Sequence, residues 1–202
     1  MAGIGHSVGF GAEEAGLQNG FNLGESELVM SAVVDPYFDG LLIMTVSGDG
    51  ATALEESWLQ TRMLPAGLKV KMGKFLSGIG YQNSQHKHAW DFADQNLAYL
   101  GLLGGEGFKD VGVQVTWLAP TPFYALFGLE ALQGNDQERF GTQISNDDAQ
   151  TIIASNQPFS AAQSGSRLNT LFAKFAPDIG ADQALQIGVS YAQAQHYQQL
   201  LD

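Results

Sequence analysis

The stretch Val111-Gly112-Val113-Gln114-Val115-Thr116-Trp117 alternates apolar and polar side chains with a period of two. Because successive side chains of a β-strand point to opposite faces, this stretch predicts a strand with one apolar and one polar face. A second stretch, Leu185-Gln186-Ile187-Gly188-Val189-Ser190-Tyr191, repeats the pattern. Such strands are typical of membrane-spanning β-barrels, but the half-buried sheet of a soluble protein shows the same alternation.

Strand-like segments recur along the chain and are separated by turns rich in Pro, Gly and Asp. Turns at 35–40, 64–67, 119–122 and 177–183 join them as hairpins, which predicts an all-β antiparallel meander of about eight strands. Residues 1–25 are rich in Gly and acidic residues, so we divide the chain into an N-terminal segment, 1–25, and a β domain, 26–202. The expected strands are 26–34, 41–47, 53–63, 68–76, 111–118, 123–132, 167–176 and 184–192.

The hairpin around the turn at 64–67 has a register that its side chains favour. That register sets Leu59 opposite Met72, whereas a slip of one residue would set Leu59 against Lys71. The other face of the hairpin then carries charged side chains, including Glu56 and Lys69. A sheet edge that is merely exposed to solvent does not need this many charged side chains in a row.

The connections between the expected strands are unequal in length. The four hairpin turns lie at one end of the sheet, while the long segments 77–110 and 133–166 lie at the other. Outer-membrane barrels have short turns on one side and long loops on the other. Structureless loops of this length are unusual in a compact soluble domain. The pattern favours an outer-membrane-type barrel, closed by itself or forming part of a larger one, over a soluble β-sandwich or jelly roll.

Composition restricts the functions that the chain could have. The net charge of −12 disfavours binding to nucleic acid, because phosphate contacts need basic patches. The absence of cysteine excludes disulfides and cysteine-based metal sites. No apolar run approaches the roughly 20 residues of a membrane helix. Residues 1–6 lack a basic start and an apolar stretch, so no secretory signal is visible, although an outer-membrane protein has to be exported.

The barrel interpretation assigns the polar phase of the strands to an aqueous lumen and the apolar phase to lipid. The residues expected to face the lumen are Glu56, Lys69, Lys71, Gln114, Thr116, Gln186 and Ser190. Those expected to face lipid are Val111, Val113, Val115, Phe123, Phe127, Leu185, Ile187 and Val189.

The long segment after residue 76 contains a candidate metal site. Its side chains are His86, His88, Asp91 and Asp94. Imidazole and carboxylate groups at this spacing could converge on Zn²⁺ or a similar cation. The alternative is a polar loop whose His and Asp side chains are merely solvated or hydrogen-bonded locally. No nucleophile elbow or phosphate-binding loop is present, so we expect no enzymatic activity.

Several stretches resemble a family of bacterial outer-membrane barrel proteins often labelled zinc-regulated, TonB-dependent outer-membrane receptors. The resemblance spans roughly residues 16–192 and is densest between 64 and 121. It is carried by Leu23-Gly24-Glu25-Ser26-Glu27-Leu28, Asp35-Pro36-Tyr37-Phe38-Asp39-Gly40, Leu64-Pro65-Ala66-Gly67-Leu68, Gly73-Lys74-Phe75-Leu76-Ser77-Gly78-Ile79-Gly80-Tyr81, the set His86, His88, Ala89, Trp90, Asp91 and Phe92, Gly112-Val113-Gln114, and Trp117-Leu118-Ala119-Pro120-Thr121.

The resemblance implies a porin-like channel or receptor in the bacterial outer membrane, with zinc as a candidate ligand. The chain is shorter than a complete member, has no plug domain before its strands and ends at Leu200-Leu201-Asp202 without a terminal aromatic strand. We therefore expect an N-terminal part of a larger barrel, completed by its remaining half or by another protomer. The expected function is passage of a small polar solute or metal ion across the outer membrane, in contact with its lipid. The alternative is a soluble secreted β-sandwich that binds a ligand through its long loops.

Overall fold

The protein is one antiparallel sheet whose eight strands pair in chain order, from β1 to β8. The computed structural model describes residues 26–48, 50–86, 89–91, 97–105, 107–134, 166–180 and 183–194. This architecture confirms the all-β antiparallel meander predicted from the alternation. The strands are β1 (Ser26–Val33), β2 (Phe38–Val46), β3 (Thr52–Thr61), β4 (Leu68–Leu76), β5 (Lys109–Leu118), β6 (Tyr124–Leu132), β7 (Leu168–Ala176) and β8 (Ile187–Ala194).

Short helices occur in the described parts of the connections between strands. The 3-10 helix η1 (Pro65–Gly67) forms the turn between β3 and β4. The 3-10 helix η2 (Gln82–Ser84) and the α-helix α1 (Leu97–Leu103) lie in the long connection between β4 and β5. None of the helices in the described part of the chain is long and apolar enough to cross a membrane.

Strand ends differ from the predicted ones where neighbouring segments decide the pairing. β5 starts at Lys109, two residues before the predicted start, because Lys109 lies opposite Leu76 at the end of β4. β3 ends at Thr61, two residues before the predicted end, and the next residue, Arg62, still donates its amide to the carbonyl of Tyr37 at 2.8 Å. The strand propensity of a single segment does not indicate which residues of a neighbouring segment it pairs with.

The register of β3 and β4 is the predicted one. Leu59 lies opposite Met72, and Gln60 lies opposite Lys71. Between β2 and β3, however, the ladder is interrupted by a β-bulge at Ile43/Met44, where Glu55 is the additional residue on β3. A bulge bends the strand and increases its twist. The sequence pattern did not predict it.

The two faces of the sheet have different surroundings. We call inner face the one against which the described residues of segment 77–108 pack, and outer face the opposite one. The core lies between the inner face and that segment. Its buried side chains are Phe75, Leu132, Leu168 and Phe172 from the sheet, and Ile79, Leu103 and Phe108 from segment 77–108.

The outer face consists of large apolar side chains that remain exposed. Their exposed fractions lie between 37% and 66%. The side chains are Val111, Val113, Val115, Trp117, Phe127, Leu129, Leu171, Ile187, Val189 and Tyr191. Phe123 and Leu185, also expected to point outward, are exposed and lie just before β6 and β8.

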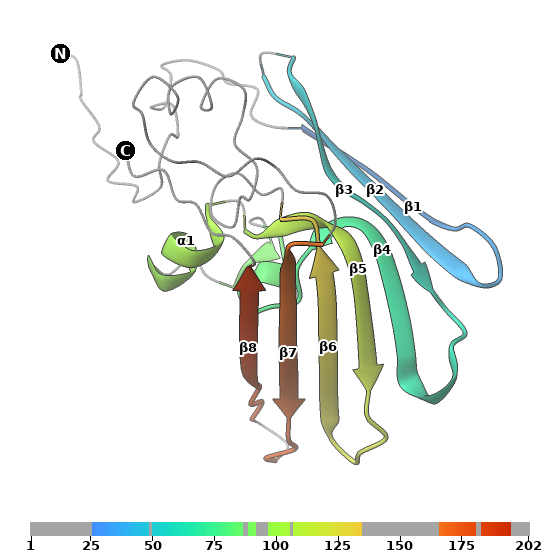
Figure 1. Ribbon diagram of the computed structural model, residues 1–202, viewed down its shortest axis with the longest axis vertical. Coiled ribbons are helices and arrows are strands. Elements are labelled where there is room, and N and C mark those ends of the chain that lie inside the picture. Colours follow the sequence, from blue (N-terminus) through green and yellow to red (C-terminus); the bar gives the residue numbers. More distant parts are fainter. Residues whose placement is uncertain are drawn as a thin grey trace.

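The sheet is curved but open. Figure 1 shows β5 to β8 side by side in the lower part of the molecule and β1 to β3 running at an angle to them at the upper right, with β4 curving between the two groups. β1 and β8 are the two edges, and among the described residues they are not paired with each other. Closure into a barrel is therefore not part of this structure. The four predicted hairpin turns share one end of the sheet, and segment 77–108 starts from the other.

Candidate functional site: the polar inner face

The inner face carries polar and charged side chains that the strands bury. Alternation along β3 to β7 places one or two of them on each strand, so they converge from five neighbouring strands. Except for half-buried Lys71, they are at least nine-tenths buried. The side chains are Glu56, Lys71, Gln114, Glu130, Thr170 and Lys174.

Glu130, in the middle of β6, is fully buried and accepts four hydrogen bonds. One carboxylate oxygen accepts from the Gly78 amide at 2.8 Å and from the Gln114 side chain at 2.7 Å. The other accepts from the hydroxyls of Ser77 and Thr170. Because Ser77 and Gly78 begin segment 77–108, Glu130 fastens the start of that segment to the sheet.

Two lysines lie near the Glu130 carboxylate but form no ion pair with it. Both Lys71 and Lys174 are attracted electrostatically by Glu130. The Lys71 ammonium lies 4.7 Å from the ring centroid of Trp58, and the Lys174 ammonium lies 5.4 Å from that of Phe172. Cation–π contacts of this kind partly compensate the desolvation of an ammonium group.

A second carboxylate, Glu56, fastens segment 77–108 at another point. It accepts from the Trp58 indole at 3.1 Å and from the Leu76 amide at 3.4 Å. Its other oxygen lies 2.8 Å from Nε2 of His86. The hydrogen bond to Glu56 raises the pKa of His86 above its usual value, so the charged imidazolium is favoured in the folded chain.

Segment 77–108 is also held by its own hydrogen bonds. The Asn83 side chain donates to the carbonyls of Ser77 and Phe108 at 2.8 and 2.9 Å and accepts from the Phe108 amide at 2.6 Å. The Gly80 amide donates to the Ser190 hydroxyl of β8 at 3.0 Å. These bonds span the inner face from β4 to β8.

Two glycines allow this close approach. The Phe172 ring lies over Gly128, its partner on β6, and also against Gly78. A Cβ atom on either glycine would overlap the ring. An aromatic side chain that covers a glycine on the neighbouring strand stabilises the pair.

The structure places the residues expected to face a lumen as follows. Glu56, Lys71, Gln114 and Ser190 lie on the inner face, where their contacts are those given above. Lys69 is exposed and lies opposite half-buried Thr116. The remaining residue of that set, Gln186, is exposed and precedes β8.

The candidate metal ligands are not brought together in the part of the chain that the structure describes. His86 contacts Glu56, while Asp91 accepts a hydrogen bond from the Tyr81 hydroxyl at 2.6 Å. His88 and Asp94 lie outside the described residues. Within the described ranges, no group of three or more His, Asp or Glu side chains could hold a metal ion.

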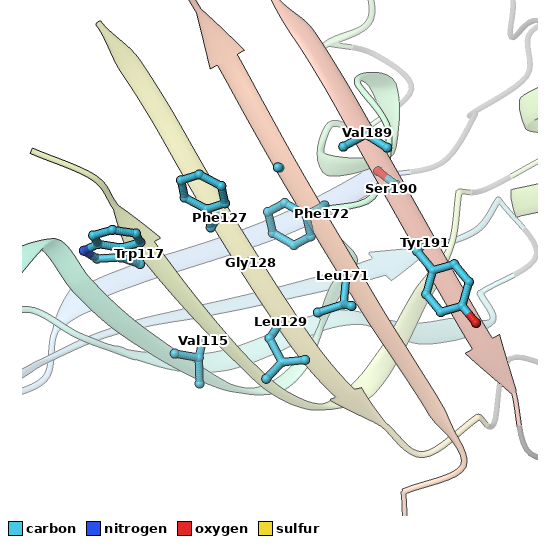
Figure 2. Close-up of a pocket in the computed structure, with 11 residues that line it drawn as sticks. Val115, Trp117, Phe127, Gly128, Leu129, Leu171, Phe172, Val189, Ser190 and Tyr191 are labelled. Carbon is cyan, nitrogen blue, oxygen red and sulfur yellow. The ribbon is translucent and has the colours of Figure 1, made fainter. Parts of the chain in front are cut away.

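Figure 2 shows the outer face opposite this site, with the apolar side chains of β5 to β8 pointing away from the sheet. They line a shallow groove of about 440 Å³. Trp117 and Phe127 stack with ring centroids 5.6 Å apart, and Phe127 meets Phe175 edge to face at the same distance. This aromatic row lies toward the end of the sheet that carries the short turns.

An uncharacterized protein of Aquifex aeolicus (strain VF5) is 51% identical to this chain over 138 residues. The matched residues are 67% of this chain and 29% of the relative, so the chain spans less than a third of the relative's length. No family model matches the chain, and no solved structure matches it.

Proposed function

We propose that this chain forms part of the wall of an outer-membrane β-barrel, which acts as a channel or receptor for a small polar solute or metal ion. The observation that carries this proposal is a distribution of side chains opposite to that of a soluble protein. Large apolar groups stay exposed on the outer face, whereas carboxylates and an ammonium are buried on the inner face. Soluble monomers rarely expose a contiguous apolar surface of this extent.

A barrel in a bilayer, with lipid outside and water in its lumen, would suit both faces. Lipid tails would cover the outer side chains, and the ladders between adjacent strands would satisfy the backbone groups that hydrocarbon cannot. The charged side chains would face a lumen that holds water, as intramembrane charges usually do. In the described part of the chain no second sheet covers the outer face, as the soluble β-sandwich alternative would require.

Two further features support the same proposal. The aromatic row of Trp117, Phe127 and Phe175 suits the girdle that barrels place at the membrane interface. Segment 77–108 lies against the inner wall, where it would narrow the lumen and give selectivity. Zinc remains the proposed metal at His86, His88, Asp91 and Asp94. The proposal assigns no catalysis to the chain.

Closure would come from strands beyond these eight. β1 and β8 are the edges of the sheet, so an antiparallel ladder can continue at either of them. The closing strands would belong to the remaining part of a longer chain or to another protomer. The matched stretch is 29% of the Aquifex relative, which leaves room for such strands in that protein.

Reconstitution into phosphatidylcholine vesicles tests this function. Vesicles that contain the chain should swell in a small uncharged sugar faster than vesicles without protein. Val113→Arg should reduce the amount of inserted chain, because it places a charge on the outer face. Thr121→Arg, in an exposed turn, is the matched control and should insert normally. A chain that is monodisperse in buffer without detergent and leaves vesicles untouched would support the soluble β-sandwich instead.

A further inference from the structure

Three lysines project from the inner side of the sheet. They are Lys69 and Lys71 on β4, and Lys174 on β7. In the part of the chain that the structure describes, none of them forms an ion pair. The chain as a whole carries a net charge of −12, so unpaired cations gathered on one face are unexpected.

Burial makes these unpaired charges costly. Lys174 is only 9% exposed and Lys71 is half-buried, yet their closest described partners are aromatic rings. An ammonium group has three donors, and a ring face satisfies none of them as an oxygen would. Buried charges are normally paired, so the donors of these two lysines need water or an anion.

The neighbouring carboxylates do not fill this role. Both oxygens of Glu130 are occupied by neutral donors, and those of Glu56 by Trp58, Leu76 and His86. They attract the lysines only at longer range.

We propose that this inner face attracts and transiently binds small anions that carry phosphate or carboxylate oxygens, through Lys69, Lys71 and Lys174. The hydroxyl of Thr116, opposite Lys69, is a further donor on the same face. Weak sites spaced along a wall suit passage better than one tight site. This inference names the solute class of the proposed channel and rests on that function for the solute's access to the wall.

Iodide quenching measures the local anion concentration next to Lys71. The chain has three tryptophans, so Trp90→Phe and Trp117→Phe leave Trp58, whose ring lies under the Lys71 ammonium, as the only one. In detergent micelles, iodide quenching of Trp58 is compared with quenching by neutral acrylamide. We expect Lys71→Gln to lower the iodide-to-acrylamide ratio roughly threefold, Lys71→Arg to preserve it, and inorganic phosphate or acetate to reduce it by competition.

The matched control is Lys109→Gln, because Lys109 is paired with Glu55. This variant should leave the ratio unchanged. A second measurement, the reversal potential across a planar bilayer in a KCl gradient, should show anion preference that Lys69→Gln and Lys174→Gln weaken. Competition by phosphate alone, or by acetate alone, identifies the preferred oxyanion.

The outcomes separate this inference from the proposed function. Equal quenching ratios in the wild type and in the Lys71→Gln variant would overturn anion binding, even if vesicles swell in sugar. Charge-dependent quenching in a chain that gives no flux would overturn the channel and support the anion site.

Discussion

Removal of the Glu130 side chain should release segment 77–108 from the sheet. In Glu130→Ala, the Gly78 amide and the Gln114 side chain lose an acceptor at 2.8 and 2.7 Å in a fully buried position. The hydroxyls of Ser77 and Thr170 can rotate toward other acceptors, whereas the Gly78 amide is held by the backbone and the Gln114 side chain is buried. Each buried donor without an acceptor costs about 1–3 kcal/mol, so we expect a loss of about 2–6 kcal/mol in unfolding free energy.

Glu130→Gln is the conservative comparison. Its amide oxygen can still accept from Gly78 and Gln114, and its NH₂ group can donate to the two hydroxyls after they rotate. This variant should lose less than about 2 kcal/mol, mainly through the attraction of Lys71 and Lys174 to the lost charge.

Urea unfolding in detergent micelles, followed by tryptophan fluorescence, gives the free energies, and limited proteolysis reports the position of segment 77–108. Cleavage within that segment should be faster in Glu130→Ala than in Glu130→Gln. If the two variants are equally stable, within about 1 kcal/mol of the wild type, and are cleaved equally slowly, Glu130 does not fasten the segment.

Other substitutions test the two faces and the second fastening point. Val113→Arg on the outer face should cost about 2–4 kcal/mol of stability in vesicles if the site lies near the bilayer midplane. Gly128→Ala should destabilise the sheet by about 1–3 kcal/mol, because its methyl group overlaps the Phe172 ring. The contact between His86 and Glu56 should stabilise segment 77–108 fully below the ordinary histidine pKa of 6.5 and lose its effect as the pH rises through the raised pKa of the folded chain.

Each of these predictions has a direct check. Vesicle insertion assays at increasing urea give the cost of Val113→Arg, which should vanish in buffer without lipid. For Gly128→Ala, unfolding free energies equal to those of the wild type would show that Phe172 moves freely. Proteolysis at low and high pH, in the wild type and in His86→Ala, should differ between the two proteins only at low pH. A difference that persists at high pH would rule out the charged imidazolium as the cause.

Much of the sheet could be predicted from the sequence because the relevant signal is local. The alternation in 111–117 fixes both the strand and the face of each side chain, and the pattern around Leu59 and Lys71 fixes the register of β3 and β4. The bulge at Glu55 has no such signal, because it depends on how β2 and β3 match along their lengths.

The polar cluster could be predicted only in part. The polar phase of the strands predicts Glu56, Lys71 and Gln114 on this face, whereas Glu130, Thr170 and Lys174 occupy the same phase on β6 and β7 and are not among the predicted residues. Gly128, Glu130 and Leu132 share one face, so the period of two could have found that carboxylate. Its donors Ser77 and Gly78 lie 53 and 52 residues earlier in the chain, and no local pattern indicates that segment 77–108 packs against the inner face.

The central claim is that the outer face contacts lipid, and a cysteine scan of β5 tests it most directly. The chain contains no cysteine, so single cysteines at 111 and at 113 to 117 can be spin-labelled without removing a native thiol; position 112 is left out because a Cβ atom on Gly112 would overlap the Ala131 carbonyl. In vesicles, collision rates with oxygen, which partitions into lipid, are compared with those of a water-soluble nickel chelate. We predict high oxygen and low nickel access at 111, 113, 115 and 117, and the opposite ratio or protection from both at 114 and 116. Protection from both reagents at the odd positions, or no alternation at all, would contradict a lipid-facing outer face.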